Sequence, residues 1–167
     1  EGITAHALLA DAGTTTINGG TFNGKDNYNG FNVDASEGAT VYITGGNFLP
    51  VHSGSLYGKG TIAVSGGTFF DAVPEERCAA GYIPQVNSDG TYGVVQGLAG
   101  EGTEENPYLI KSLTDLKFFR DDVNEGNTYA GKYIKLTAAI DLNNEEWTPI
   151  GNDINKFQGY FDGNEKT

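Results

Sequence analysis

Thr15-Thr-Ile-Asn-Gly-Gly-Thr-Phe22 recurs with small changes as Val41-Tyr-Ile-Thr-Gly-Gly-Asn-Phe48 and again as Ile62-Ala-Val-Ser-Gly-Gly-Thr-Phe69. The Gly-Gly pairs begin at positions 19, 45 and 66, so successive repeats are 26 and 21 residues apart. A period of that length, carried by β-branched and aromatic residues, is typical of stacked β repeats and not of a helical array. The pattern therefore predicts a mainly β chain that contains a parallel β-helix, or β-solenoid.

Hydrophobic and polar residues alternate inside each repeat, which predicts that one face of every strand is buried. The expected inward residues are Thr15, Ile17, Val41, Ile43, Ile62 and Val64, and the expected outward residues are Asn18, Thr44 and Ser65. Each Gly-Gly pair suits a corner with positive φ, or a place where a neighbouring backbone comes close. If the repeats stack, then Phe22, Phe48 and Phe69 form a ladder. The polar stretches 23–29 and 50–55 are predicted loops.

Residues 72–95 depart from the repeat pattern and predict a cap for the end of the stack. Pro74 suits the first turn of a short helix, and Gly81 suits its C-terminal end. Two strand-like stretches around Asp89-Gly90 predict a hairpin. A helix and a hairpin together would cover the unpaired strand edge that a solenoid exposes. We expect the repeat module and its cap to span residues 1–97.

A glycine-rich linker at 96–102 predicts a module boundary, with a second, small α+β module at 98–167. One helix is predicted at about 113–125. Ser112 and Asp115 have the spacing of a capping box in front of it, and Gly126 suits its end. Strands are predicted at 108–110, 133–142, 147–150 and 157–161.

The composition favours an exported protein over a nucleic-acid-binding one. The net charge of −12 would repel a polyphosphate backbone, so nucleic acid is not an expected partner. Cys78 is the single cysteine and cannot form an internal disulfide. Apolar runs are too short to cross a bilayer, so no membrane insertion is expected within this segment. Because the sequence contains no Met, we interpret it as a segment of a longer protein, monomeric by itself.

No catalytic residue is predicted. Glycoside hydrolysis requires two carboxylates held about 5 to 10 Å apart across a groove. The acidic pairs are adjacent in the chain, and they are interpreted as surface charges: Glu75-Glu76, Asp121-Asp122 and Glu145-Glu146. Arg77 and Arg120 are expected in helices beside acids, and Cys78 has no motif that supplies a base. We therefore expect a protein that is not an enzyme.

No metal or cofactor site is predicted either. The stretch 19–26 resembles the glycine and aspartate spacing of calcium-binding β-rolls, but the other two repeats carry no aspartate in register. His6 and His52 are 46 residues apart and lack the spacing of metal ligands. A single calcium site at 141–146 or 162–164 stays open as an alternative.

Aromatic residues give the best reason to consider sugar binding, because their rings can stack on pyranose faces. Trp147 is the first candidate, although packing in a core is favoured for it. Tyr28, Tyr57 and Tyr129 are expected in loops and could contribute to recognition. The ligand-binding residues themselves are unassigned.

The run Gly102-Thr-Glu-Glu-Asn-Pro-Tyr-Leu-Ile-Lys-Ser112, together with residues 131–142, Trp147-Thr-Pro-Ile-Gly151 and Phe157-Gln-Gly-Tyr-Phe-Asp-Gly-Asn164, resembles the lead-in to the GLUG-type β-helical region. That region occurs in large bacterial surface proteins, including the non-catalytic part of immunoglobulin A proteases. The chain departs from the pattern after Asn164, where Glu165-Lys-Thr167 replaces a glycine and a hydrophobic strand. Residues 1–97 are similar to glycine-rich repeat regions in surface proteins of anaerobic Gram-positive bacteria.

This resemblance implies a non-catalytic structural or adhesive module of a large secreted or cell-surface bacterial protein. Its partner would be a glycan or a protein on a host or bacterial surface. The alternative is a carbohydrate-binding or carbohydrate-active β-helix module, such as a polysaccharide lyase or hydrolase. A fold by itself does not identify a ligand.

Overall fold

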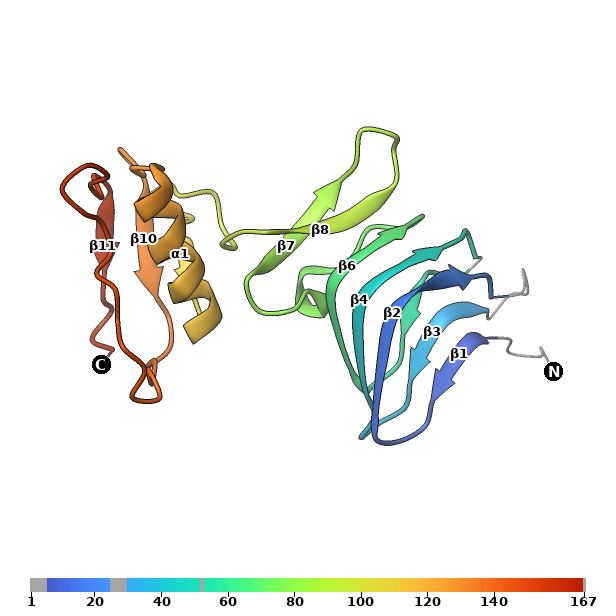
Figure 1. The fold of residues 1–167 in the computed structure, drawn as a ribbon. Helices are drawn as coiled ribbons and strands as arrows, with labels where there is room; N and C mark the ends of the chain where they lie inside the picture. The colour runs from blue at the N-terminus through green and yellow to red at the C-terminus, as the bar shows by residue number, and fades with distance from the viewer. Residues whose placement is uncertain (1–5, 25–29, 52, 167) are drawn as a thin grey trace. The chain divides into compact units, whose positions relative to one another are not determined.

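The computed structural model describes residues 6–24, 30–51 and 53–166, and it divides into two compact units, Glu1–Val95 and Gln96–Thr167. Along unit 1 run the strands β1 (His6–Ala10), β2 (Thr14–Phe22), β3 (Phe31–Ala35), β4 (Thr40–Phe48), β5 (Leu56–Tyr57) and β6 (Thr61–Phe69), the 3-10 turn η1 (Glu75–Arg77), and the strands β7 (Tyr82–Val86) and β8 (Tyr92–Gln96). Unit 2 contains β9 (Tyr108–Ile110), the helix α1 (Leu113–Glu125), β10 (Tyr133–Leu136) and β11 (Tyr160–Asp162) (Figure 1). The described chain is mainly β, as the sequence predicts.

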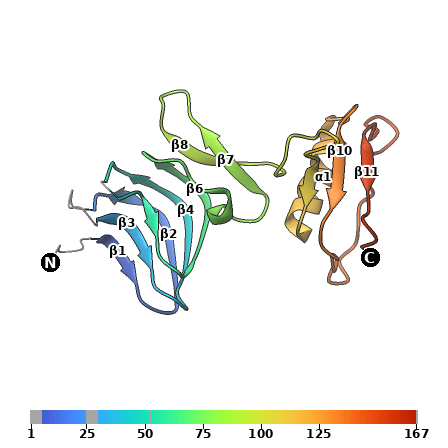
Figure 2. The ribbon, with the colours of Figure 1, turned by 180° about the vertical axis from the view of Figure 1, so that it is seen from behind.

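The first strands of unit 1 form two parallel sheets that alternate along the chain. Strands β1, β3 and β5 pair in one sheet, and β2, β4 and β6 pair in the other. Each repeat therefore contributes a short strand to the first sheet and a nine-residue strand to the second, as Figures 1 and 2 show. The repeat motif reveals only the second set, because the short strands have no sequence in common.

The turns between the two sheets are stacked as well. The amide of Ser36 donates to the carbonyl of Ala10 at 2.8 Å, and the amide of Gly60 donates to the carbonyl of Ala35 at 2.9 Å. Corresponding positions in successive repeats are thus hydrogen-bonded to one another outside the strands too. This pairing satisfies backbone groups that a turn would otherwise have to expose to water.

Both sheets supply side chains to one hydrophobic core. The buried residues from the first sheet are Ala10, Val33 and Ala35, and those from the second are Ile17, Val41, Ile43, Phe48, Ile62, Val64 and Phe69. The alternation in the repeats predicts the inward aliphatic residues of the second sheet correctly. The two parallel sheets of unit 1 therefore share a single interior.

The predicted phenylalanine ladder is confirmed. The rings of Phe22 and Phe48 stack with centroids 4.9 Å apart, and those of Phe48 and Phe69 stack at 4.5 Å and an interplanar angle of 4°. The three residues are also in register on neighbouring strands. An aromatic pair of this kind contributes about 0.5 to 1.5 kcal/mol beyond the burial of its rings.

The Gly-Gly pairs lie where the register between neighbouring strands shifts. The second glycine of the last pair, Gly67, has a φ of 108°, which a residue with a Cβ rarely adopts. The first glycine, Gly66, approaches the strand beneath it so closely that a Cβ would lie 2.3 Å from the carbonyl oxygen of Thr44. Both expected reasons for glycine, positive φ and a close neighbouring backbone, therefore apply.

The segment after the third repeat differs in part from its prediction. In place of a short helix, the chain makes the single 3-10 turn η1 after Pro74. One turn is enough to bring the Arg77 guanidinium to the carbonyls of Gly58 and Gly60, to which it donates at 2.7 and 2.9 Å. The hairpin β7–β8 follows, and β8 pairs antiparallel to β6. It occupies the edge that the third repeat would otherwise leave open.

Unit 2 consists of a parallel sheet in the order β11-β10-β9, with α1 on one of its faces. Phe119 and Val123 of the helix are buried together with Ile110 and Ile134 of the sheet. The Ser112 hydroxyl accepts a hydrogen bond from the Asp115 amide at 3.2 Å, which is the N-cap interaction that the sequence predicts.

Of the strand predictions in unit 2, one is too long, one is wrong and one is displaced. Strand β10 ends at Leu136 although the alternation continues to residue 142, and residues 147–150 form no strand. Strand β11 covers Tyr160–Asp162 instead of 157–161. The amide of Thr137 donates to the carbonyl of Ile110, the last residue of β9, at 2.9 Å. Beyond Thr137 the chain has passed the last residue of β9, the strand with which β10 pairs. Hydrophobic alternation does not show where a partner strand ends.

Candidate functional site

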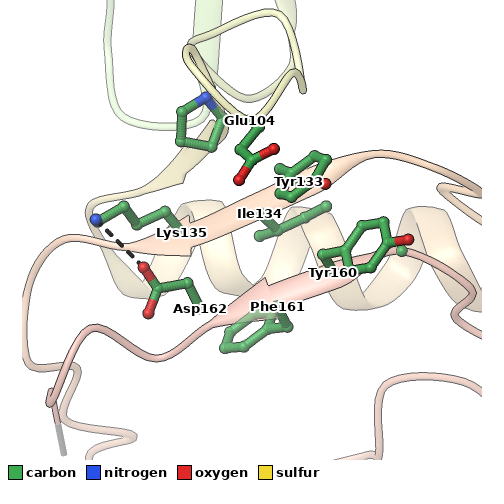
Figure 3. A pocket seen from close by; sticks show the side chains of 9 residues that line it. Glu104, Tyr133, Ile134, Lys135, Tyr160, Phe161 and Asp162 are labelled. Carbon is green, nitrogen blue, oxygen red and sulfur yellow. Dashed lines mark ion pairs between the residues drawn. The ribbon is translucent and has the colours of Figure 1, made fainter.

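A groove of about 510 Å³ lies over the sheet of unit 2 (Figure 3). It is lined by Glu104, Pro107, Tyr133, Ile134, Lys135, Gly159, Tyr160, Phe161 and Asp162. Side chains alternate along a strand, so Tyr133 and Lys135 lie on the face of β10 opposite to the buried Ile134. The parallel register of β10 and β11 places Tyr160 beside Tyr133 and Asp162 beside Lys135. The volume is in the range of small-molecule sites, about 300 to 1,000 Å³.

Two tyrosines form the aromatic part of the groove. The rings of Tyr133 and Tyr160 stack with centroids 4.5 Å apart and an interplanar angle of 18°. Tyr160 belongs to the edge strand of the sheet and its residue is 58% exposed. Tyr133 therefore supports one face of the Tyr160 ring.

An ion pair forms a polar end of the groove. The Lys135 Nζ lies 3.2 Å from a carboxylate oxygen of Asp162, and the Asn164 amide donates to the same carboxylate at 2.8 Å. The Asn164 backbone amide and, after it, Lys135 lower the pKa of Asp162. The Asp162 carboxylate is therefore ionised at neutral pH and acts as a hydrogen-bond acceptor.

Glu104 lies beside Tyr133 on another side of the groove (Figure 3). Loss of solvent around the hydroxyl and, after it, the charge of Glu104 raise the pKa of Tyr133. The Tyr133 hydroxyl is therefore protonated at neutral pH. The groove thus combines two stacked aromatic rings with two carboxylates and a lysine.

The aromatic residues suggested by the sequence lie elsewhere. The ring of Trp147 is covered by the Arg120 guanidinium, whose central carbon lies 4.8 Å from the ring centroid. Tyr57 belongs to β5, not to a loop, and its ring stacks on Phe31 at 4.1 Å. Tyr28 lies outside the described residues.

Tyr129 lies in an irregular segment, as expected, but its ring is buried and so is not available for recognition. Tyr129 is 7% exposed and packs in the core of unit 2, with its hydroxyl donating to Asp122 at 2.6 Å. Burial and, after it, the hydrogen bond to Asp122 raise the pKa of Tyr129. A loop position in the sequence does not reveal this, because a chain in an irregular conformation can still direct a ring inward.

The three acidic pairs lie in different surroundings. Asp121 pairs with Arg120 at 2.7 Å, Asp122 accepts from Tyr129, and Glu145 pairs with Lys117. Glu75 and Glu76 are exposed. Asp121, Asp122 and Glu145 thus contact three different residues.

The residues considered for metal binding are also dispersed. His6 lies in β1, with its Nε2 3.4 Å from Asp34, while His52 lies outside the described residues. The carboxylates of Asp141 and Asp162 accept from backbone amides two residues further along the chain, each at 2.8 Å. Within the ranges that the structure describes, no three histidine, cysteine or acidic side chains come together in a way that could hold a metal ion.

Cys78 lies directly after η1 and is half-buried. Burial and the charges of Glu75 and Glu76 raise the pKa of its thiol to about 11. The thiol is therefore neutral at physiological pH, which is the opposite of what a nucleophile requires.

The sequence analysis did not identify the groove. Its residues come from three separate stretches, and the two tyrosines that form it are 27 positions apart. The sequence carried one signal, because Tyr133-Ile-Lys and Tyr160-Phe-Asp both begin with Tyr. The structure places these two stretches in parallel register. Recognising it required knowing that these two strands pair.

Comparison with known proteins gives one partial similarity. A stretch of 66 residues, 39% of this chain, is 42% identical to the "Putative Gly-rich membrane protein" of Evansella cellulosilytica, and it spans 8% of that protein's length. No family model matches the sequence, and no solved structure matches it. In the part of the chain that the structure describes, no helix combines the length and the hydropathy needed to cross a bilayer. Over part of its length, the chain is thus similar to a bacterial glycine-rich protein described as a membrane protein.

Proposed function

We propose that the chain is a non-catalytic structural and adhesive module of a large protein on a bacterial cell surface, and that unit 1 is a parallel β-solenoid. The in-register stacking of the three repeats carries this proposal. Residues of one repeat pack on the same residues of the next, as the phenylalanine ladder illustrates. In such a stack each repeat is stabilised by its neighbours, so the structure can be extended by adding repeats. That property suits a spacer that holds the adhesive part of the protein away from the cell.

The surface chemistry and the partial similarity support a place at the cell envelope. A net charge of −12 favours solubility and resists self-association outside the cell. The similar protein is bacterial and is described as a membrane protein. A repeat module displayed by a protein that is anchored through another segment is consistent with both facts.

Unit 2 fits the proposed role of a lead-in to a second β-helix. Its three strands are parallel, and Tyr108, Ile134 and Phe161 occupy one column across them. Phe161, at the open side of this column, is 45% exposed. A further parallel strand beside β11 would bury it in the same way as Ile134 is buried now.

The surface role can be tested by labelling the source bacterium. Antibodies raised against this chain should bind intact cells, and brief protease treatment of those cells should remove the signal. An antibody against a cytosolic protein serves as the control for cell integrity. Labelling that requires opened cells would contradict the proposal.

The solenoid can be tested by cross-linking its outer surface. Thr16 and Tyr42 are exposed neighbours in the register of β2 and β4. In a Cys78→Ser background, Thr16→Cys with Tyr42→Cys should form a disulfide, because adjacent strands are about 4.8 Å apart. Thr16→Cys with Ala63→Cys spans two strand spacings, about 9.6 Å, and should not. Equal cross-linking of both pairs would contradict the stacking.

Carbohydrate recognition is the second candidate function, and the groove of unit 2 favours it. A hydrolase would need a carboxyl group whose pKa is raised so that it can donate a proton near neutral pH. In the groove the pKa of Asp162 is lowered instead. The lowered pKa of Asp162 does not suit this carboxyl group to the role of proton donor. Release of reducing ends from a polysaccharide by the purified chain would contradict the non-catalytic role.

A further inference from the structure

We propose that the edge of unit 1 formed by β1 and β2 binds a further Gly-Gly-x-Phe repeat of the same surface protein, which lies as the preceding turn of the stack. The inference rests on the proposed solenoid and deepens it by naming the edge at which the stack continues and the partner that fits there. Strands β1 and β2 are each the first strand of their sheet, whereas β8 occupies the opposite edge, beside β6. Within the described residues, the stack is therefore open in one direction.

Gly19 supplies the first argument. In the next two repeats, the first glycine of the pair faces the strand of the repeat before it. An added Cβ at Gly45 would lie 2.8 Å from the carbonyl oxygen of Asn18, and one at Gly66 would lie 2.3 Å from that of Thr44. Gly19 has no positive φ, and among the described residues nothing lies within 4 Å of its added Cβ. Glycine inside a strand costs about 0.5 to 1 kcal/mol relative to alanine. A preceding strand would give Gly19 the same close neighbour that the other two glycines have.

The composition of the edge supplies the second argument. An open edge strand can pair with other chains, and proteins commonly protect such an edge with charged residues or proline. Strand β2 is nine residues long and contains neither, since it reads Thr-Thr-Thr-Ile-Asn-Gly-Gly-Thr-Phe. The edge strand β11 of unit 2 is only three residues long and ends on Asp162. A long edge without protection fits a strand that is paired in the whole protein.

The ladder indicates which side chain the partner carries. Phe48 and Phe69 each stack on the ring of the preceding repeat and are 1% exposed. Phe22 begins the ladder and is only partly buried. A phenylalanine in a preceding repeat would cover the open face of Phe22 in the same way, so the partner should carry Phe at the ladder position.

The backbone indicates the register of the partner. The amide of Leu49 donates to the carbonyl of Phe22 at 2.9 Å, and the amide of Phe70 donates to the carbonyl of Phe48 at 3.1 Å. The residue after each ladder phenylalanine thus donates to the ladder phenylalanine of the repeat before. The corresponding donor in the first repeat is the amide of Asn23, and the carbonyl of the partner's phenylalanine would accept from it.

The probe for this edge is a synthetic peptide of residues 31–49, which contains β3 and β4 and so both strands of one repeat. When it is titrated into the full isotope-labelled chain, it should shift the amides of β1 and β2, including that of Asn23. A second peptide with Phe48→Ala lacks the ring for the ladder. It should bind about tenfold more weakly, which corresponds to about 1.4 kcal/mol.

Variants of the full chain then test the close approach. Gly19→Ala should weaken peptide binding about tenfold or more, because its methyl group occupies the place of a carbonyl oxygen of the peptide. Its urea midpoint should stay the same, since in the chain alone that methyl group meets no described atom. Thr16→Ala changes an exposed side chain of the same strand and should leave the affinity within about twofold.

Any of four results would overturn the inference: no amide shifts with the peptide, shifts that cluster at β11, unchanged affinity in Gly19→Ala, or self-association of the chain that Gly19→Ala abolishes. The last result, measured by sedimentation, would assign the edge to a second copy of the chain. The cross-link between positions 16 and 42 tests the stack itself. A chain that cross-links there but binds no peptide would contradict this inference and leave the solenoid standing.

Discussion

The aromatic side chains of this protein act differently according to whether a neighbouring strand covers them. Phe48 lies between two other rings of the ladder and is 1% exposed. Phe70, one residue beyond the end of the ladder, is 54% exposed. Tyr160 resembles Phe70 in exposure but is supported by a second ring. Position within the stack therefore determines how much of an aromatic ring is buried.

Phe48→Ala should destabilise unit 1 by about 3 to 5 kcal/mol, because it removes a buried ring and leaves a cavity between its two neighbours. Phe70→Ala is the control and should change the free energy of unfolding by less than about 0.5 kcal/mol. Urea unfolding followed by far-ultraviolet circular dichroism measures both. Similar losses in the two variants would show that the ladder contributes nothing specific.

The Cys78 thiol should be almost unreactive at pH 8. Its pKa of about 11 means that alkylation by iodoacetamide should be about a hundredfold slower than for an ordinary cysteine. The rate should rise with pH until about 11 and return to the ordinary value in urea. The pKa of the Cys78 thiol is higher in the folded chain than in the unfolded chain. The contribution of the neutral thiol to the free energy of unfolding is therefore lost as the pH rises from 9.0 to about 11. Fast alkylation of the folded chain at pH 8 would contradict the burial.

At the scale of the strands, the Gly-Gly pairs set how closely the repeats approach. The first glycine of each pair has the same role in the sequence motif, but its surroundings change along the stack. Nothing lies within 4 Å of a Cβ added at Gly19, whereas one added at Gly66 would lie 2.3 Å from the carbonyl oxygen of Thr44. The difference arises because β2 is at the edge of its sheet while β6 packs against β4.

Gly66→Ala should therefore destabilise unit 1 by more than about 2 kcal/mol, because the strand must move away from its neighbour. Gly19→Ala introduces the same methyl group into open space, at a residue whose φ is not positive, and should cost less than about 0.5 kcal/mol. The free energy of unfolding in urea checks both. Equal costs would mean that the close approach of β6 and β4 is not a constraint.

The helix α1 depends on its N-cap. Replacing Ser112 by Ala removes the acceptor for the Asp115 amide and should cost about 1 kcal/mol. Thr114→Ala alters an exposed residue in the first turn and should cost less than about 0.5 kcal/mol. The urea midpoint of Trp147 fluorescence reports on unit 2 and distinguishes the two variants.

At the scale of the whole chain, the two units have separate cores with no residue in common. Each core is closed by its own strands, and Trp147, the single tryptophan, belongs to unit 2. Separate cores predict separate unfolding transitions, because cooperativity depends on shared packing.

Phe48→Ala should therefore lower the unfolding midpoint of the circular dichroism signal and leave that of Trp147 fluorescence unchanged. Ser112→Ala should lower the Trp147 midpoint. A single transition for both probes, shifted equally by either variant, would show that the units unfold together.

Much of unit 1 could be predicted from local sequence. The three repeats identify β2, β4 and β6, and their alternation identifies the buried Ile43 and Val64. The short strands β1, β3 and β5 could not be predicted, because two to five residues carry too little periodicity. The end of β10 was missed for a different reason: hydrophobic alternation continues where the partner strand stops.

The sequence by itself determined the repeated strands, the residues of the ladder and the positions of the Gly-Gly corners, because these depend on side-chain alternation and on local backbone conformation. Only the tertiary structure decided that Tyr133 and Tyr160 would stack, that Glu104 and the ion pair of Lys135 and Asp162 would surround them, and that Tyr129 would turn inward. These features arise from the register between strands that are far apart in the chain. Register is set by the packing of the whole unit and leaves no mark at any single position.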